Sequence, residues 1–164
     1  MSAAGTRTGI GWDSHRFKAG RALILGGVEF AGAELGLDGH SDADVLTHAV
    51  MDALLGAAGL GDIGTHFPDT DVAYEGADSI ALLREVVASI AAEGWQVVHV
   101  DATVLMERPK VGPHRDAIRA CLAAALGLDE RDVNVKASTG EGMGFVGRVE
   151  GVAALAVATV AVAP

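Results

Sequence analysis

Asp13 and His15 stand two positions apart in the segment GIGWDSHRF, which covers residues 9–17. Side chains at positions i and i+2 of an extended strand point to the same side, so the carboxylate and the imidazole would project together. An oxygen and an imidazole nitrogen placed in this way could share one divalent ion. A strand end with a polar rim would explain the same spacing. The motif alone does not decide between the two interpretations.

Asp44, His48 and Asp52 recur every four residues in GHSDADVLTHAVMDALLG, residues 39–56, and form one stripe on a predicted helix. His48 would complete a three-ligand site with Asp13 and His15, leaving a fourth position open as in catalytic zinc sites. Asp52, one turn further on, would then orient the imidazole. An ordinary solvated helix face is the alternative.

Two further features could contact a ligand. His40 lies just before the N-terminus of the predicted helix, where free N–H groups favour anions. The segment KASTGEGMGFVGRVEG, residues 136–151, has glycines that allow close backbone approach, and it offers the polar side chains of Ser138, Thr139, Glu141 and Arg148. A glycine-rich turn between strands would explain this second pattern equally well.

The composition restricts the class of protein. The 164 residues fit one domain, 1–164, with residues 1–6 expected to be a loose tail. A net charge of −10 argues against nucleic-acid partners, and an anionic substrate would need local cations such as metal ions. The last apolar run, residues 152–163, is too short to cross a bilayer, so we expect no membrane association and a cytoplasmic protein.

Hydrophobic periodicity and glycine positions predict the order of the elements. Strands are expected over residues 7–13, 95–106, 132–138 and 152–163, with a hairpin over 21–30, helices over 41–57, 77–93 and 113–127, and an irregular loop over 59–78. This order predicts an α+β two-layer sandwich with a mixed β-sheet and helices on one face. The last strand is expected to be buried on both faces, and an uncovered apolar sheet face would need burial between subunits.

Taken together and in this order, these stretches resemble the 2-C-methyl-D-erythritol 2,4-cyclodiphosphate synthases of the non-mevalonate isoprenoid pathway. The resemblance also covers ERPKVGPH, residues 107–114, and runs from residue 9 to residue 151. It implies an intramolecular phosphoryl transfer. The 2-phosphate of 4-diphosphocytidyl-2-C-methyl-D-erythritol 2-phosphate attacks the β-phosphorus, closes a cyclic diphosphate and releases CMP.

The resemblance implies Zn²⁺ on Asp13, His15 and His48, and Mg²⁺ or Mn²⁺ on Glu141 and the substrate phosphates. His40 and Thr139 match positions assigned to transition-state stabilisation. The family is a homotrimer whose sheets face the three-fold axis and whose active sites lie between neighbouring subunits. Phe145, Arg148 and Glu150 fall where the family lines a central cavity that binds isoprenoid diphosphates.

The resemblance also implies the substrate contacts. The methylerythritol phosphate part would meet His40, Ser41, Asp62, Ile63 and Gly64, with Phe67, Pro68, Asp69, Thr70 and Asp71 close by. The cytidine diphosphate end would meet the segment 106–112, with Met106, Pro109, Lys110 and Gly112, together with Ser138 and Thr139. Ser14, Gly140, the metal ligands, Phe145 and Arg148 complete the implied set.

Three positions depart from the family's pattern, and none of them is a metal ligand. Trp12 replaces a common phenylalanine, Ser138 a threonine and Gly112 a larger apolar residue. These departures affect only the fine shape of the nucleotide pocket. Two other functions stay open: a zinc phosphohydrolase, which would use the same ligands to activate water, and a non-catalytic trimeric diphosphate-binding protein.

Overall fold

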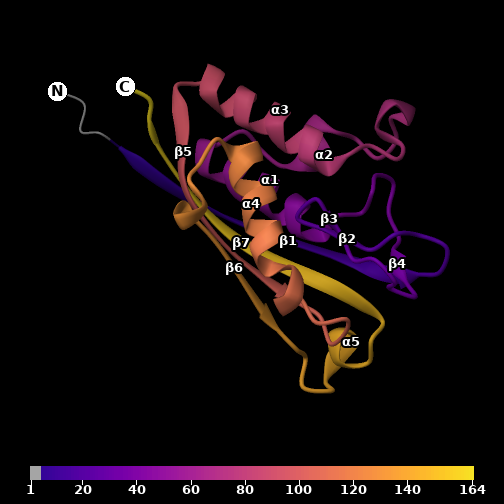
Figure 1. Ribbon diagram of the computed structural model, residues 1–164. Coiled ribbons are helices and arrows are strands. Elements are labelled where there is room, and N and C mark those ends of the chain that lie inside the picture. Colours follow the sequence, from indigo (N-terminus) through magenta and orange to yellow (C-terminus); the bar gives the residue numbers. More distant parts are fainter. Residues whose placement is uncertain (1–4) are drawn as a thin grey trace.

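A five-stranded β-sheet forms one layer of the molecule, and helices cover one of its faces (Figure 1). The computed structural model describes residues 5–164. The strands lie in the order β4 (Gly36–Leu37), β1 (Thr6–Lys18), β7 (Gly151–Val162), β5 (Trp95–Leu105) and β6 (Val133–Ser138). The helices are α1 (Val45–Ala58), α2 (Ile63–His66), α3 (Ser79–Ala92), α4 (Arg115–Leu126) and α5 (Gly144–Gly147).

The sheet is mixed, because β5 and β6 run parallel while the other neighbouring strands are antiparallel. The predicted hairpin is present as the separate pair β2 (Ile24–Leu25) and β3 (Val28–Glu29). Short 3₁₀ helices cover Val72–Tyr74, Gly112–His114 and Glu130–Asp132. The α+β prediction, with a mixed sheet and helices on one face, is confirmed.

Glycines bring the first helix unusually close to the first strand. A side chain at Gly9 or Gly11 of β1 would collide with the backbone carbonyls of Ala53 or Ala49 of α1. Side chains alternate along β1, so Asp13 lies on the same helix-facing side as these glycines. The small residues therefore place α1 directly against the side of β1 that carries the predicted metal ligands.

The first helix begins later than the sequence predicted. The N-cap of α1 is Asp44, not Ser41, and its buried carboxylate accepts a hydrogen bond from Thr47 N at 3.0 Å. The same carboxylate accepts from Gly26 N at 2.9 Å and from Gly27 N at 2.7 Å. Burial raises the pKa of Asp44, while these N–H donors oppose the shift. Asp44 thus joins the β2–β3 hairpin to α1 and does not belong to the metal-binding stripe.

Two other expectations about the chain need correction. The segment 59–78 is not wholly irregular, because it contains α2 and the 3₁₀ helix Val72–Tyr74, capped by Asp62 and Asp71. The expected loose tail over residues 1–6 is too long, since Thr6 already belongs to β1; its first four residues lie outside the described part of the chain.

A register shift in β5 alters the predicted alternation of side chains. The sequence places Val98 on the same side as Val100 and Ala102. A shift between Val97 and His99 leaves Val98 39% exposed, whereas Val100 and Ala102 are buried. Such a bulge adds one residue to a strand and reverses the sides that follow, which periodicity alone does not reveal.

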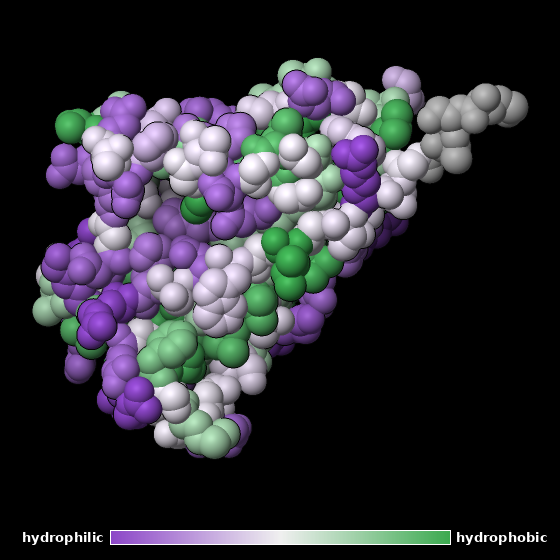
Figure 2. Space-filling model, turned by 180° about the vertical axis from the view of Figure 1, so that it is seen from behind, coloured by the Kyte–Doolittle hydropathy of each residue, from purple (hydrophilic) through white to green (hydrophobic). Residues whose placement is uncertain are grey.

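The face of the sheet away from the helices is apolar and largely uncovered. Ile10 is 70% exposed and Trp12 50% exposed, and their partners in β7 are Val157 and Leu155. The sequence predicted that β7 is buried on both faces. In the single chain this does not hold along the whole strand, because Val157 is 40% exposed. Seen from behind, the molecule shows hydrophobic residues gathered across the middle of its surface (Figure 2). Among the described residues, no helix combines the length and apolar composition that crossing a membrane requires.

Candidate active site

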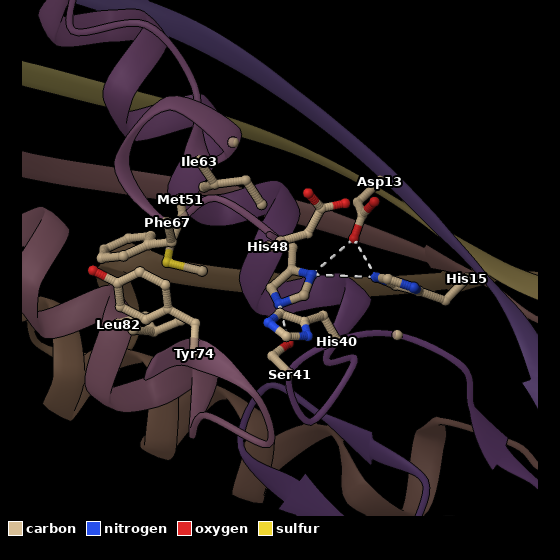
Figure 3. A pocket seen from close by; sticks show the side chains of 13 residues that line it. Asp13, His15, His40, Ser41, His48, Met51, Ile63, Phe67, Tyr74 and Leu82 are labelled. Carbon is tan, nitrogen blue, oxygen red and sulfur yellow. Dashed lines mark hydrogen bonds and ion pairs between the residues drawn. The ribbon is translucent and has the colours of Figure 1, made fainter. Parts of the chain in front are cut away.

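Asp13, His15 and His48 point toward one another at one end of a pocket (Figure 3). Oδ2 of Asp13 lies 2.9 Å from Nε2 of His15 and 3.0 Å from Nδ1 of His48. The two imidazole nitrogens are 3.2 Å apart. The sequence-based prediction that β1 and α1 bring these three side chains together is confirmed.

The three donor atoms fit a zinc ion. Two ligand atoms, each about 2.0–2.1 Å from a tetrahedral zinc ion, would lie about 3.3 Å apart, close to the three separations in this cluster. Nδ1 of His15 donates to the carbonyl oxygen of Asp38 at 2.7 Å, which leaves the lone pair of Nε2 directed at the cluster. Two neutral imidazoles and one carboxylate are a usual zinc donor set.

The cluster also shifts the protonation equilibria of its own members. Burial raises the pKa of Asp13, but hydrogen bonds from His15 and His48 outweigh it, and the pKa falls to about 2. Burial likewise lowers the pKa of His15, but its hydrogen bond to Asp13 outweighs burial and the pKa is raised. The Asp13 carboxylate therefore stays charged at neutral pH and attracts a cation.

The second ring nitrogen of His48 contacts hydroxyl groups. Nε2 lies 2.9 Å from Oγ of Ser79 and 3.2 Å from Oγ of Ser41. The carboxylate of Asp52 instead accepts a hydrogen bond from Ile63 N at 2.8 Å, where α2 begins. The prediction that Asp52 orients His48 is therefore wrong. Ser79 lies 31 residues away from His48 in the sequence, and no local spacing indicated it.

The metal cluster opens into a pocket of about 410 Å³. Its apolar wall is formed by Met51, Phe67, Tyr74 and Leu82 (Figure 3). The implied substrate contacts that line it are Asp13, His15, His40, Ser41, Ile63, Gly64, Phe67 and Asp69. Asp62, Pro68, Thr70 and Asp71 belong to the same part of the chain without lining the pocket.

His40 is held in place from several sides. The guanidinium of Arg21 donates hydrogen bonds to the carbonyls of Gly39 and Ser41, at 2.7 Å and 2.5 Å. It therefore binds the backbone on both sides of His40. The imidazole Nε2 lies 3.0 Å from the carbonyl oxygen of Asp71. Arg21 was missed by sequence reasoning, because it lies 18 and 20 residues away from its two partners.

The remaining implied contacts form a second group, since the lining of the metal pocket comes entirely from residues 13–82. Met106 N donates to the carbonyl of Ser138 at 3.0 Å, which joins the segment 106–112 to the glycine-rich loop. In that loop Oγ1 of Thr139 donates to the carboxylate of Glu141 at 3.0 Å. Within this single chain, Thr139 and Glu141 therefore do not reach the metal pocket that contains His40. Lys110, Pro109, Gly112 and Gly140 belong to this second group.

Phe145 and Arg148 lie at a third place. Ser14, Arg16, Phe145 and Glu150 line a smaller pocket of about 270 Å³. The Arg148 guanidinium is paired with the Glu150 carboxylate at 2.7 Å. The three residues implied for the family's central cavity, Phe145, Arg148 and Glu150, thus lie near one another at the end of the sheet near α5.

A two-layer α+β domain in which an Asp–His–His group able to hold a metal ion opens into a pocket is typical of metal-dependent enzymes. The sequence profile of the YgbB family matches residues 6–161, and the chain belongs to this family. The 2-C-methyl-D-erythritol 2,4-cyclodiphosphate synthase of Bordetella petrii is 59% identical over 155 residues, which cover 94% of this chain and 95% of that protein. The resemblance stated from the sequence is confirmed.

Some relatives carry this domain within a longer chain. The bifunctional enzyme IspD/IspF of Anaeromyxobacter dehalogenans is 61% identical over 92% of this chain, which spans only 39% of that protein. Among solved structures, a 2C-methyl-D-erythritol-2,4-cyclodiphosphate synthase in a form bound to CDP superposes with a TM-score of 0.86 at 38% identity. That alignment covers 94% of this chain and 99% of the solved one.

Proposed function

We propose that this chain converts 4-diphosphocytidyl-2-C-methyl-D-erythritol 2-phosphate into 2-C-methyl-D-erythritol 2,4-cyclodiphosphate and CMP, a step in isoprenoid precursor biosynthesis. The observation that carries this proposal is the convergence of Asp13, His15 and His48 beside a pocket. It occurs in a chain 59% identical to a synthase of that name over 95% of the synthase's length.

The pocket beside the metal cluster takes the methylerythritol phosphate part of the substrate. Its apolar wall suits the carbon skeleton, while His40 and Ser41 offer polar groups to the phosphate. The segment 106–112 with Ser138 and Thr139 takes the cytidine diphosphate end. In support, a structural relative is described as bound to CDP.

Two metal sites complete the binding of this anionic substrate. Asp13, His15 and His48 would hold Zn²⁺. Glu141 would hold Mg²⁺ or Mn²⁺ together with substrate phosphates. When bound, the cations neutralise phosphate charge and orient the reacting groups. This neutralisation is needed because the chain itself carries a net charge of −10.

The chain's own residues then position the reaction. An oxygen of the substrate's 2-phosphate forms a new bond to the β-phosphorus. The bond between that phosphorus and the bridging oxygen breaks, and its electron pair leaves with CMP. The second pKa of a phosphate monoester is about 6, so the attacking group is already ionised and no side chain has to remove a proton. His40 and Thr139 contact phosphoryl oxygens whose charge rises in the transition state.

The complete site lies between subunits of a homotrimer. Two observations support this arrangement: the pocket that contains His40 is lined by residues 13–82, without Thr139, and the uncovered sheet face around Ile10 and Trp12 is apolar. Three sheets facing a common axis would cover this surface and bring the two groups together. Phe145 and Arg148 would then surround the axis and bind an isoprenoid diphosphate.

The function is tested by following CMP after the substrate is mixed with the protein and Mg²⁺ in ¹⁸O-labelled water, with and without a chelator. We expect CMP and the cyclic diphosphate to form in equal amounts, without solvent oxygen in either product, and the chelator to stop the reaction. Labelled oxygen in the product would identify a phosphohydrolase instead. Substrate binding without CMP release would identify a diphosphate-binding protein.

A further inference from the structure

The imidazole of His48 connects the metal cluster to a buried polar chain behind it. Its Nδ1 faces Oδ2 of Asp13 at 3.0 Å, whereas Nε2 faces Oγ of Ser79 at 2.9 Å. A neutral imidazole carries one proton, so only one of these nitrogens is able to donate. When Nδ1 binds a metal ion, the proton lies on Nε2, and the group that faces Nε2 has to accept a hydrogen bond from it.

Ser79, the first residue of α3, is fully buried and is held by one carboxylate. Its hydroxyl donates to Oδ1 of Asp42 in a short hydrogen bond, and its backbone N–H donates to Oδ2 of Asp42 at 2.9 Å. An ionised carboxylate only accepts hydrogen bonds. The hydroxyl proton of Ser79 is thus donated to Asp42. Toward Nε2 of His48 the hydroxyl oxygen acts as a hydrogen-bond acceptor.

An acceptor at this position favours one tautomer of His48. A proton on Nε2 is donated to Ser79, and Nδ1 is then able to bind an ion beside Asp13 and His15, whereas without an ion the Asp13 carboxylate favours a proton on Nδ1 instead. The contact from Ser41 is weaker at 3.2 Å, and the Ser41 oxygen also accepts from Ala43 N. Ser79 is therefore the main partner of Nε2, and Asp42 sets the direction of the hydroxyl.

We propose that Ser79 and Asp42 are positioning residues that fix His48 as an Nδ1 metal ligand through the path Asp42–Ser79–His48. This inference rests on the proposed zinc site and deepens it, because it assigns the residues that hold one metal ligand in place. It also gives the start of α3 a function beyond packing, since that helix begins with Ser79, which contacts Nε2 of His48.

The test measures zinc affinity by competition with a chromophoric chelator, and the tautomer of His48 by long-range ¹H–¹⁵N NMR of the zinc-loaded protein. Ser79→Ala should weaken zinc binding about ten- to a hundredfold, the usual effect of removing a hydrogen-bond partner of a metal-bound histidine. Ser79→Thr keeps the hydroxyl and should restore most of the affinity. Ser89→Ala, which removes a hydroxyl that donates to Glu85 O on the same helix, is the matched control and should not alter affinity.

Asp42→Asn provides a second variant should Ser79→Ala fail to fold. An amide has one acceptor oxygen, so if that oxygen serves the backbone N–H of Ser79, the amide NH₂ faces the hydroxyl. The hydroxyl would then turn toward His48 and favour the Nδ1–H tautomer, which cannot bind a metal ion through Nδ1. We expect zinc binding to weaken, and a smaller share of His48 to show the Nε2–H pattern at a given zinc concentration.

Unchanged zinc affinity with an unchanged tautomer in the folded variants would overturn the proposal. An Nδ1–H tautomer of His48 in the zinc-loaded wild-type protein would also overturn it. Neither measurement uses the substrate, so failure of this inference is distinct from failure of the proposed function, which appears as absent CMP release by the zinc-loaded wild-type protein.

Discussion

Gly11 of β1 lies directly against the backbone carbonyl of Ala49 in α1, with no room for a side chain between them. His48 precedes Ala49, and Asp13 follows Gly11 by one alternation of the strand. This contact between strand and helix is what allows one carboxylate and two imidazoles to meet. The spacing of the metal site thus depends on a residue that has no side chain.

Gly11→Ala should therefore weaken both the fold and the metal site. The added methyl group must push α1 away from β1, and overpacking of this kind costs about 1–3 kcal/mol of unfolding free energy. Urea unfolding and zinc competition measure the two effects. Gly56→Ala is the control, because its nearest non-local atom would be Ile10 O at 3.9 Å and alanine favours a helix. Equal stability and zinc affinity in Gly11→Ala would contradict the proposed role of the contact.

Arg21→Lys should lower the rate of CMP release about tenfold while the protein remains folded. One guanidinium holds the carbonyls on both sides of His40, and an ammonium on a flexible stem cannot reproduce that fork. The loss of one charged hydrogen bond, about 1.5–3 kcal/mol, corresponds to a tenfold or larger change in rate. Steady-state kinetics measure the effect, with Arg84→Lys on α3 as the control. A rate equal to that of the control would rule out this role for Arg21.

Thr139→Ala should slow the chemical step itself. If its hydroxyl contacts a phosphoryl oxygen whose charge rises, its removal should cost about 2.7–4 kcal/mol, a hundred- to a thousandfold in rate. Single-turnover measurements isolate this step from product release. An unchanged single-turnover rate would remove Thr139 from the reaction.

Ile10→Asp should dissociate the proposed trimer. Ile10 is 70% exposed in the isolated chain and would be buried between subunits, where an unpaired carboxylate is costly. Sedimentation velocity should report a particle near three times 16.7 kDa for the wild-type protein and near 16.7 kDa for the variant. Val72→Asp provides the control, since Val72 is 76% exposed on a 3₁₀ helix in the segment between α2 and α3. A monomeric wild-type protein would refute the assembly.

The Asp13–His15 pair should stabilise the metal-free protein most between about pH 4 and 6.5. Burial opposes the shift, but the histidine hydrogen bonds lower the pKa of Asp13 from 3.8 to about 2, so its contribution of about 2 kcal/mol is complete above pH 3.8 and declines toward pH 2. His15 behaves in the opposite way: its pKa is raised from 6.5, so its contribution is present below pH 6.5 and is lost as pH rises through the folded value.

Urea unfolding of the chelator-treated protein across this range, compared with Asp13→Asn and His15→Gln, measures the two contributions. The difference in unfolding free energy between wild type and His15→Gln should shrink as the pH rises above 6.5. A difference that grows with pH would contradict the sign of the shift.

Local periodicity predicted the structure correctly where a residue's environment depends on its near neighbours in the sequence. The Asp13–His15 spacing predicted a shared side of β1, and the stripe containing His48 predicted a helix that faces it. The bulge that exposes Val98 was not predictable, because both registers bury apolar residues and the choice depends on pairing with β7.

Hydrogen-bond partners that lie far apart in the sequence were not predictable either. Arg21, Ser79 and Asp42 act on His40 and His48 through contacts that join distant segments of the chain, and the sequence carries no periodic signal for such contacts. Asp44 and Asp52 had suitable spacing, but they cap and connect helices. Spacing thus predicted which side chains share a face, whereas tertiary packing decided which partner each of them received.

Zinc K-edge X-ray absorption of the zinc-loaded protein tests the central claim most directly. The account predicts one zinc ion per chain, with imidazole nitrogens and a carboxylate oxygen at about 2.0–2.1 Å and the signature of two imidazole rings, lost when His48 is replaced by alanine. A shell without imidazole scattering, or a shell that His48→Ala leaves unchanged, would contradict it.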